Sequence, residues 1–198
     1  MTPLFCRIKS PIFDIQQMLK SYHDHISKFE PTKYKDNNAD YAGWALLNSS
    51  GQSSDDVKYL HKSKAKPTNK FFTEACDDNF KSIIQNLRED GFSPFRCRIM
   101  KLLNDTDKKM NWHVDSKKEH SWRIHIPFVT TINSLFQWRS GGKIYSHHLP
   151  ADGCAYAVRV DIEHRAINPS KDDRIHFLCG TEKVFLESSK TIEVLQWL

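Results

Sequence analysis

The chain has 198 residues, of which 39% are hydrophobic, 12% aromatic and 27% charged, with only 7 Gly and 8 Pro. This composition excludes collagen-like, low-complexity and wholly disordered proteins, and it favours one globular domain over 1–198. The formal net charge of +5 is spread along the chain, so it permits contact with nucleic acid without the clustered basic patch that would indicate it.

The first part of the chain, 1–90, has the features of a helical and loop region that supports the rest. Apolar residues recur at steps of three and four after Pro11 and again before Gly91, which is the spacing of amphipathic helices. A long polar stretch between them is a candidate lid. We expect helices over 12–29 and 71–88, a loop over 31–40, a short strand or strand pair over 41–48, and a loop over 49–70.

The second part, 91–198, predicts a β-rich core. Its apolar and polar residues alternate in short stretches that are divided by turn residues, as strands require. We expect these strands to pack against the helices of the first part. The predicted strands cover 96–103, 121–128, 134–138, 143–147, 155–161, 173–179 and 183–187.

Nothing in the sequence indicates a signal peptide or a membrane span. The start of the chain carries Asp14 and lacks an unbroken apolar stretch, and the longest apolar run, 41–47, is far shorter than a bilayer requires. The 5 cysteines are scattered without a CxxC pair, which argues against a disulfide framework and a thiolate zinc site. We therefore expect a cytoplasmic protein with reduced cysteines and no membrane partner.

His113 and Asp115 are separated by one residue and follow a predicted strand and turn. In an extended chain, side chains two residues apart point to the same face, so this imidazole and carboxylate can bind one ion. The triplet alone is common by chance. However, His164 lies downstream and Arg174 follows ten residues later.

Two imidazoles and one carboxylate leave coordination positions open, as in non-haem Fe(II) sites. Zinc is the competing ion, but a hydrolytic zinc site gives no role to Arg174. The planar guanidinium of an arginine suits the carboxylate of an organic diacid bound beside a metal.

Two predicted strands share an Arg-x-His pattern. Arg123 and His125 alternate with aliphatic residues, and Arg174 and His176 do the same. In a sheet with one buried face, the polar side chains would be exposed to water. In a closed or doubled sheet they would line a cavity, and the nearby candidate metal triplet favours the cavity.

The sequence from Cys97 to Gly180 resembles the aspartyl/asparaginyl β-hydroxylase-like branch of the Fe(II)/2-oxoglutarate-dependent dioxygenases, which includes hydroxylases of free amino acids such as proline. The resemblance implies a double-stranded β-helix, also called a jelly roll and similar to cupins, of about eight strands with N-terminal helices packed on one sheet. The matching segments are Arg98-Ile99-Met100-Lys101-Leu102 leading into His113-Val114-Asp115, then Arg123-Ile124-His125-Ile126-Pro127, and His164 through Asn168 to Arg174-Ile175-His176.

The resemblance also implies a role for each site residue. His113, Asp115 and His164 would hold Fe(II), and Arg174 would bind the distal carboxylate of 2-oxoglutarate. Arg123 and His125 would face the metal end, near the other carboxylate of 2-oxoglutarate or near the substrate. The implied reaction consumes O2 and 2-oxoglutarate, with ascorbate as a possible addition in vitro, and hydroxylates an amino acid that is free or peptidyl.

Two alternatives stay open at this point. A nucleobase-directed oxygenase of the same chemistry would bind single strands with an affinity that falls steeply with salt. A non-catalytic jelly-roll binding module would keep the fold without the metal.

Some neighbouring residues are expected to support the site or to lie outside it. Ligand imidazoles need a hydrogen-bond acceptor, for which Asp161, Asn168 and Tyr156 are candidates. The adjacent His147 and His148 point to opposite faces of a strand, so we expect them at the rim or surface.

Overall fold

The computed structural model describes residues 3–36, 39–53, 70–103, 110–115, 121–181 and 191–198. In chain order they form β1 (Pro3–Ile8), α1 (Ile15–Asp24), a 3-10 helix (Ile26–Lys28), β2 (Thr32–Asp36), β3 (Ala39–Asn48), β4 (Phe71–Phe72), α2 (Asp78–Glu89), β5 (Pro94–Leu102), β6 (Trp122–Val129), β7 (Leu135–Ser140), β8 (Lys143–His148), β9 (Ala155–Arg159), β10 (His164–Ile167), β11 (Arg174–Thr181) and β12 (Ile192–Trp197).

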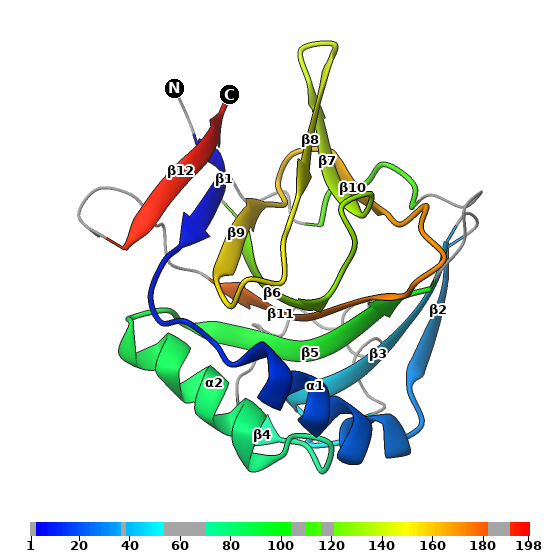
Figure 1. Cartoon of the computed structure of the whole chain (residues 1–198), viewed down its shortest axis with the longest axis vertical. Helices are drawn as coiled ribbons and strands as arrows, with labels where there is room; N and C mark the ends of the chain where they lie inside the picture. The colour runs from blue at the N-terminus through cyan, green and yellow to red at the C-terminus, as the bar shows by residue number, and fades with distance from the viewer. Residues whose placement is uncertain (1–2, 37–38, 54–69, 104–109, 116–120, 182–190) are drawn as a thin grey trace.

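The strands form two antiparallel sheets, which is the jelly-roll architecture that we expected. The large sheet has the order β12-β1-β9-β6-β11-β5-β3-β2, with β4 added to β3, and the small sheet has the order β10-β7-β8. Figure 1 shows α1 and α2 on the face of the large sheet that points away from the small sheet. Consecutive strands of the sequence often lie in different places of the two sheets, so the site can draw on several distant segments.

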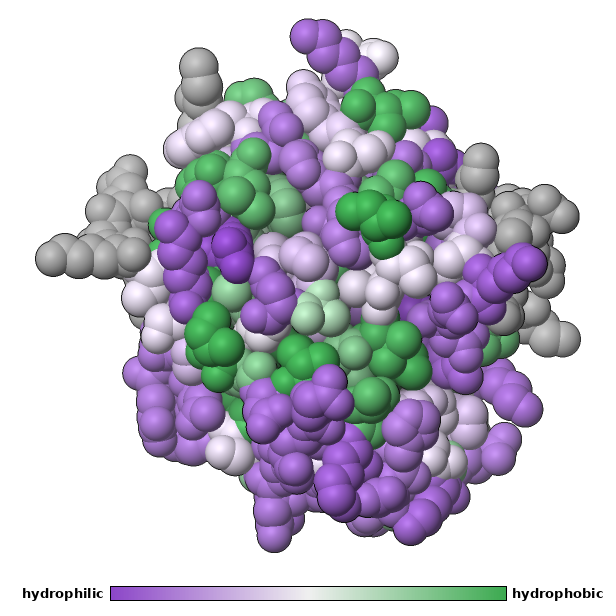
Figure 2. All heavy atoms as spheres, viewed as in Figure 1, coloured by the Kyte–Doolittle hydropathy of each residue, from purple (hydrophilic) through white to green (hydrophobic). Residues whose placement is uncertain are grey.

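The outer core lies between the helices and the large sheet. Four apolar residues of α2 are buried at helical spacing, and the Phe80 ring stacks on Phe177 of β11 with centroids 6.1 Å apart. Complete burial of each such side chain contributes about 1.5–3 kcal/mol. The exposed sides of the helices are polar. In Figure 2, which has the same view as Figure 1, the lower part of the molecule, where the helices lie, is mainly hydrophilic.

The inner core lies between the two sheets, on the side of β1 and β9. Trp138 of β7 is fully buried there against Phe5 of β1, and its indole N–H donates to the carbonyl of Arg159 (2.9 Å). Over β5, β6 and β11 the inner face instead carries arginines and histidines. The apolar half of the interior therefore fixes the small sheet, while the other half forms a cavity.

Helix caps explain why both predicted helices begin later than the apolar spacing suggested. The Asp14 carboxylate accepts a hydrogen bond from Gln17 N–H (3.0 Å), so α1 starts at Ile15 and not at residue 12. The Asp77 carboxylate caps α2 in the same way, and the preceding phenylalanines form β4. Gly91 ends α2 as predicted, with a positive φ of 80°.

The first ninety residues contain more strand than we expected. Residues 31–40 were predicted to be a loop, but 32–36 form β2, which pairs with β3. The strand predicted over 41–48 is confirmed as part of β3. Strands β1, β10 and β12 were not predicted either, because their alternation is short or interrupted.

Most strands of the second part are confirmed, with bounds that shift by a few residues. The strand predicted over 183–187 and most of the loop predicted over 49–70 lie outside the described residues. Within the described ranges, no helix is long and apolar enough to cross a membrane.

Candidate metal centre

Backbone pairing joins the two segments that carry the candidate ligands. His113 N–H donates to the carbonyl of His164 (3.1 Å), and His164 N–H donates to the carbonyl of His113 (2.9 Å). Asp115 N–H donates to the carbonyl of Val160 (3.0 Å). The segment around His113 therefore runs antiparallel to the start of β10, and it places both imidazoles on one side.

Each imidazole is oriented by a backbone carbonyl two residues earlier. Nδ1 of His113 lies 2.8 Å from the carbonyl oxygen of Asn111, and Nδ1 of His164 lies 2.8 Å from that of Ile162. Because a carbonyl oxygen only accepts hydrogen bonds, Nδ1 of each ring is the protonated nitrogen. In the neutral form of each ring the lone pair is then on Nε2, and this is the form that binds a metal ion.

The two Nε2 atoms face the carboxylate of Asp115. His113 Nε2 lies 3.6 Å from Asp115 Oδ1, and His164 Nε2 lies 3.3 Å from Oδ2. Two ligands at right angles on one ion, with bonds of about 2.0–2.2 Å, lie about 3 Å apart. The three ligand atoms all lie within 4.8 Å of one another, so the group fits a divalent metal ion.

The electrostatics of the group suit a cation. Burial raises the pKa of the Asp115 carboxyl. Arg123, whose Nη2 lies 2.8 Å from Oδ2, acts in the opposite direction, as do the two histidines. Together they outweigh burial and hold the pKa of Asp115 well below its usual range. Burial lowers the pKa of His113. At neutral pH the site therefore offers a carboxylate and a neutral His113 imidazole, and a metal ion binds without displacing a proton from either.

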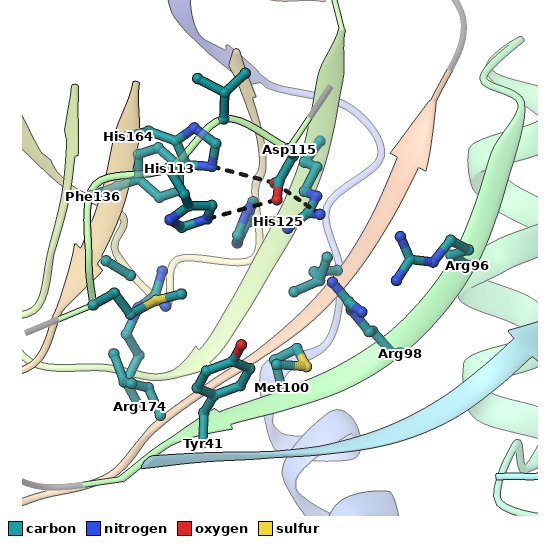
Figure 3. A pocket seen from close by; sticks show the side chains of 16 residues that line it. Tyr41, Arg96, Arg98, Met100, His113, Asp115, His125, Phe136, His164 and Arg174 are labelled. Carbon is teal, nitrogen blue, oxygen red and sulfur yellow. Dashed lines mark ion pairs between the residues drawn. The ribbon is translucent and has the colours of Figure 1, made fainter. Parts of the chain in front are cut away.

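The ligand group opens into a cavity of about 510 Å³ between the two sheets. Side chains of β3, β5, β6 and β11 line it from the large sheet, and Phe136 and His164 line it from the small sheet. Figure 3 shows the histidines and Asp115 at one wall, with Arg174 on one side and Arg98 and Arg96 on the other. The volume lies in the range of pockets that hold small organic ligands.

Arg174 is placed as a buried cation in this cavity. The residue is 7% exposed, and its Nη2 has no hydrogen-bond partner among the described residues. Burial lowers the pKa of its guanidinium to about 9, so it stays charged at neutral pH. A buried guanidinium nitrogen without an acceptor is costly, and a ligand carboxylate would remove that cost.

The polar faces of the two Arg-x-His strands point inward, as the cavity interpretation predicted. Arg123 and His125 line the cavity, while Ile124 and Ile126, which alternate with them, belong to the outer core. His125 and His176 form a buried pair with 3.4 Å between their Nδ1 atoms. The Nε2 atom of His125 has no hydrogen-bond partner among the described residues, so it is available to a ligand.

The residues expected to accept hydrogen bonds from the candidate ligand imidazoles have other hydrogen-bond partners. Asp161 accepts from Arg159, the Tyr156 hydroxyl donates to Asp152, and the Asn168 amide donates to the carbonyl of Asp172. This expectation was wrong because the acceptors are the backbone carbonyls described above, which side-chain patterns do not reveal.

His147 and His148 stand apart from the candidate ligands. His147 Nε2 lies 3.2 Å from the side-chain oxygen of Gln196, and His148 Nδ1 lies 3.1 Å from the carbonyl oxygen of Ser134. The cluster of possible metal ligands found among the described residues contains neither of them.

Sequence reasoning missed Arg96, Arg98 and Tyr41 as lining residues. A signal for the two arginines was present, because they alternate with buried Cys97 and Ile99 in the manner of the Arg-x-His strands. Tyr41 carries no comparable signal, since β3 is apolar along most of its length.

Comparisons with known proteins support the fold. No protein-family model matches the sequence, and no curated protein matches it. Among solved structures, a 2OG-Fe(II) oxygenase family oxidoreductase from Burkholderia pseudomallei aligns over 84% of this chain and 76% of its own, with a TM-score of 0.53 and 11% identity.

A prolyl-4-hydroxylase from Pseudomonas putida aligns over 93% of this chain and 95% of its own, with a TM-score of 0.51 and 12% identity. EvdMO1 aligns over 91% of this chain and 47% of its own, with a TM-score of 0.55 and 14% identity. The chain therefore has the jelly-roll fold of these structures. They do not single out the aspartyl/asparaginyl hydroxylase branch.

Proposed function

We propose that this chain is an Fe(II)- and 2-oxoglutarate-dependent oxygenase that hydroxylates an amino acid, either free or within a peptide. One observation carries the proposal: two imidazoles and a carboxylate converge in the same cavity as a buried guanidinium whose Nη2 has no hydrogen-bond partner among the described residues. This combination suits a metal that keeps open positions beside an organic diacid. The oxygenase and prolyl-4-hydroxylase with similar folds add support.

In this proposal, His113, Asp115 and His164 hold the metal, with Nε2 of each ring as the ligand atom. Arg123 keeps the Asp115 carboxylate ionised and limits its rotation, since Nη2 contacts one of its two oxygens. Bound Fe(II) and 2-oxoglutarate would supply the electrons that activate O2, which is the oxidant for the C–H bond. The protein orients the metal and 2-oxoglutarate and excludes water from the cavity.

Arg174 binds the distal carboxylate of 2-oxoglutarate in this proposal. Its charge and planar donors match a carboxylate, and its burial makes the ion pair strong. His125 of β6 lies opposite Leu178 of β11 and offers Nε2 to the other carboxylate or to the substrate. Phe136 stacks on the His164 ring with centroids 5.3 Å apart, so it limits the movement of that ligand.

The test is conversion of 2-oxoglutarate to succinate by the purified chain with Fe(II), ascorbate and a panel of amino acids and short peptides. Wild type should release succinate, and His113→Ala should not. Arg88→Gln, on α2 and outside the cavity lining, is the matched control and should keep the wild-type rate. Equal turnover by wild type and His113→Ala would contradict the proposal.

The same preparation separates the enzyme from a non-catalytic binding module. Mn(II) with 2-oxoglutarate should raise the melting temperature, because ligands that bind only the folded state stabilise it. A binding module without the metal site would show neither this shift nor stoichiometric iron.

A further inference from the structure

The segment that carries two of the candidate ligands has a second contact with the small sheet, through the side chain of Trp112. This residue directly precedes His113 and is not among the described residues that line the cavity. The centroid of its ring lies 4.4 Å from Cζ of Arg165 and 5.0 Å from Cζ of Arg139. An aromatic face attracts a guanidinium within about 6 Å of its centroid. The indole therefore binds the segment 110–115 to the small sheet.

The contact with Arg165 continues the pairing of the two histidine ligands. His113 and His164 form an antiparallel bridge. In an antiparallel pair, the residue before one partner lies opposite the residue after the other, so Trp112 lies opposite Arg165. Side chains that lie directly opposite each other interact more strongly than diagonal ones. The pair of Trp112 and Arg165 thus adjoins the ligand pair on the same two segments.

Trp112 is also linked to the carbonyl group that orients the His113 ring. Nδ1 of His113 lies 2.8 Å from the carbonyl oxygen of Asn111. This carbonyl belongs to the peptide group that joins Asn111 to Trp112, and a peptide group is planar and stiff. A fixed Trp112 therefore limits both the position of the His113 backbone and the rotation of the carbonyl that holds the His113 ring.

Arg165 is already oriented when the indole packs on it. Its Nε donates to the side-chain oxygen of Gln137 (2.8 Å), which lies opposite on β7. His164 and Ala166 on either side of it line the cavity, so Arg165 points to the other face of β10. The residue is half-buried. A guanidinium held in this way offers a fixed flat surface to the indole.

Arg139 contributes less to this contact than Arg165 does. Its guanidinium is farther from the indole and forms two hydrogen bonds with the carboxylate of Glu163, at 2.6 and 2.7 Å. Its side chain is nearly half exposed. Cation–π attraction is weaker for exposed cations than for desolvated ones, so the contact with Arg165 is the stronger of the two.

We propose that Trp112 is a positioning residue of the metal centre, whose indole, packed on Arg165, holds His113 in the geometry that binds the ion. This inference rests on the metal site of the proposed function and adds two residues that act through His113. Neither is a candidate ligand. Without the indole contact, the metal ion itself would have to order the segment, and the cost of that ordering would lower the affinity.

The experiment is titration of the metal-free full chain with Mn(II), well below its melting temperature. Trp112→Leu should weaken Mn(II) binding roughly three- to thirty-fold, as the loss of a cation–π contact implies. Trp112→Phe should recover part of this loss, because phenylalanine keeps an aromatic face. Trp197→Leu is the matched control and should bind like wild type, since Trp197 is 44% exposed on β12 and is not among the described residues that line the cavity. The melting temperature of each metal-free variant shows whether it is folded.

Arg165→Gln tests the other side of the contact and leaves the packing of Trp112 less disturbed. It should weaken Mn(II) binding roughly two- to ten-fold. The double variant of Trp112→Leu and Arg165→Gln should bind about as weakly as Trp112→Leu alone, because both residues act through one contact. Two independent structural effects would instead multiply.

Mn(II) binding by Trp112→Leu as tight as by wild type would overturn the inference, and so would fully multiplicative losses in the double variant. If Trp112→Leu does not fold, wild-type affinity in Arg165→Gln would overturn it. A lower melting temperature with unchanged affinity would assign Trp112 to stability alone. A wild type that binds Mn(II) but releases no succinate would overturn the proposed oxygenase function, and the same titrations would still decide this inference. A wild type that binds no Mn(II) would overturn both.

Discussion

Arg123 and Asp115 form an ion pair at the candidate metal centre, with 2.8 Å between Nη2 and Oδ2. The same Oδ2 lies 3.3 Å from Nε2 of His164. The side chains of Arg123 and Asp115 are about one-fifth exposed, so water screens the pair only in part. A strand of the large sheet thereby positions a ligand that belongs to the segment 110–115.

Replacing Arg123 with glutamine should weaken metal binding. The pKa of Asp115 would rise, because burial would no longer be opposed by the guanidinium, and the carboxylate would lose its orienting contact. Loss of such an outer contact typically lowers metal affinity by about 10–100-fold. Titration of the apo chain with Mn(II) at pH 7 measures the change, and Arg123→Lys should recover part of it.

Arg139→Gln is the control for this prediction. Arg139 forms a similar ion pair with Glu163, with 2.6 Å between Nε and Oε2, but both side chains are nearly half exposed. Exposed ion pairs contribute little free energy, so Arg139→Gln should leave the affinity for Mn(II) unchanged. An equal loss in both variants would show that the effect is general and not specific to Asp115.

Arg174 should govern binding of 2-oxoglutarate without affecting the metal. Arg174→Gln removes one partner of a buried ion pair, so the dissociation constant of 2-oxoglutarate should rise by at least roughly thirty-fold. The dissociation constant for Arg174→Lys should lie between those of wild type and Arg174→Gln, because lysine keeps the charge but lacks the planar pair of donors. Calorimetric titration of the Mn(II)-loaded variants gives these values, and Mn(II) affinity measured without 2-oxoglutarate should stay at the wild-type level. A parallel loss of Mn(II) affinity would instead assign Arg174 to the metal itself.

Much of the fold could be predicted because alternation and helical spacing are local properties. The strands of the β-rich part and the stop of α2 at Gly91 follow from residues that are neighbours in sequence. The helix starts could not be read from apolar spacing, since the caps at Asp14 and Asp77 decide them. Strand β2 was missed because its polar residues resemble a loop until β3 pairs with it.

The candidate ligands could be selected from the sequence because residue type and spacing limit what can share an ion. The orientation of their rings could not, because it depends on backbone carbonyls of Asn111 and Ile162. The ion pair between Arg123 and Asp115 could not be predicted from the sequence either. It arises from the approach of β6 to the segment 110–115, which tertiary structure alone establishes.

The buried histidines should make the protein less stable in mild acid. Burial, reinforced by Arg174, lowers the pKa of both His125 and His176 well below the ordinary value. In the unfolded chain these imidazoles bind protons below about pH 6.5, while in the folded chain they stay neutral. The free energy of unfolding therefore decreases as pH falls below about 6.5, by about 1.4 kcal/mol per pH unit for each histidine. Above about pH 6.5 both imidazoles are neutral in both states, so this loss of stability is absent.

His176→Gln should reduce this slope by about 1.4 kcal/mol per pH unit between pH 6.5 and pH 5. Urea unfolding at several pH values measures it. Phe177→Leu on the same strand is the control, because the loss of apolar contact should cost the same free energy at every pH. If the two variants changed stability in parallel across the pH range, His176 would not be the group that titrates.

Gly180 should be intolerant of a side chain because of Phe95. A Cβ on Gly180 would lie 2.4 Å from Cζ of the Phe95 ring, on the neighbouring strand β5. Gly180→Ala should therefore lower the free energy of unfolding by about 1–3 kcal/mol, as overpacking does. In a Phe95→Ala background the ring is absent, and the same substitution should cost much less. Urea unfolding of wild type, the two single variants and the double variant gives the coupling, and an equal cost of Gly180→Ala in both backgrounds would rule out the ring contact as its cause.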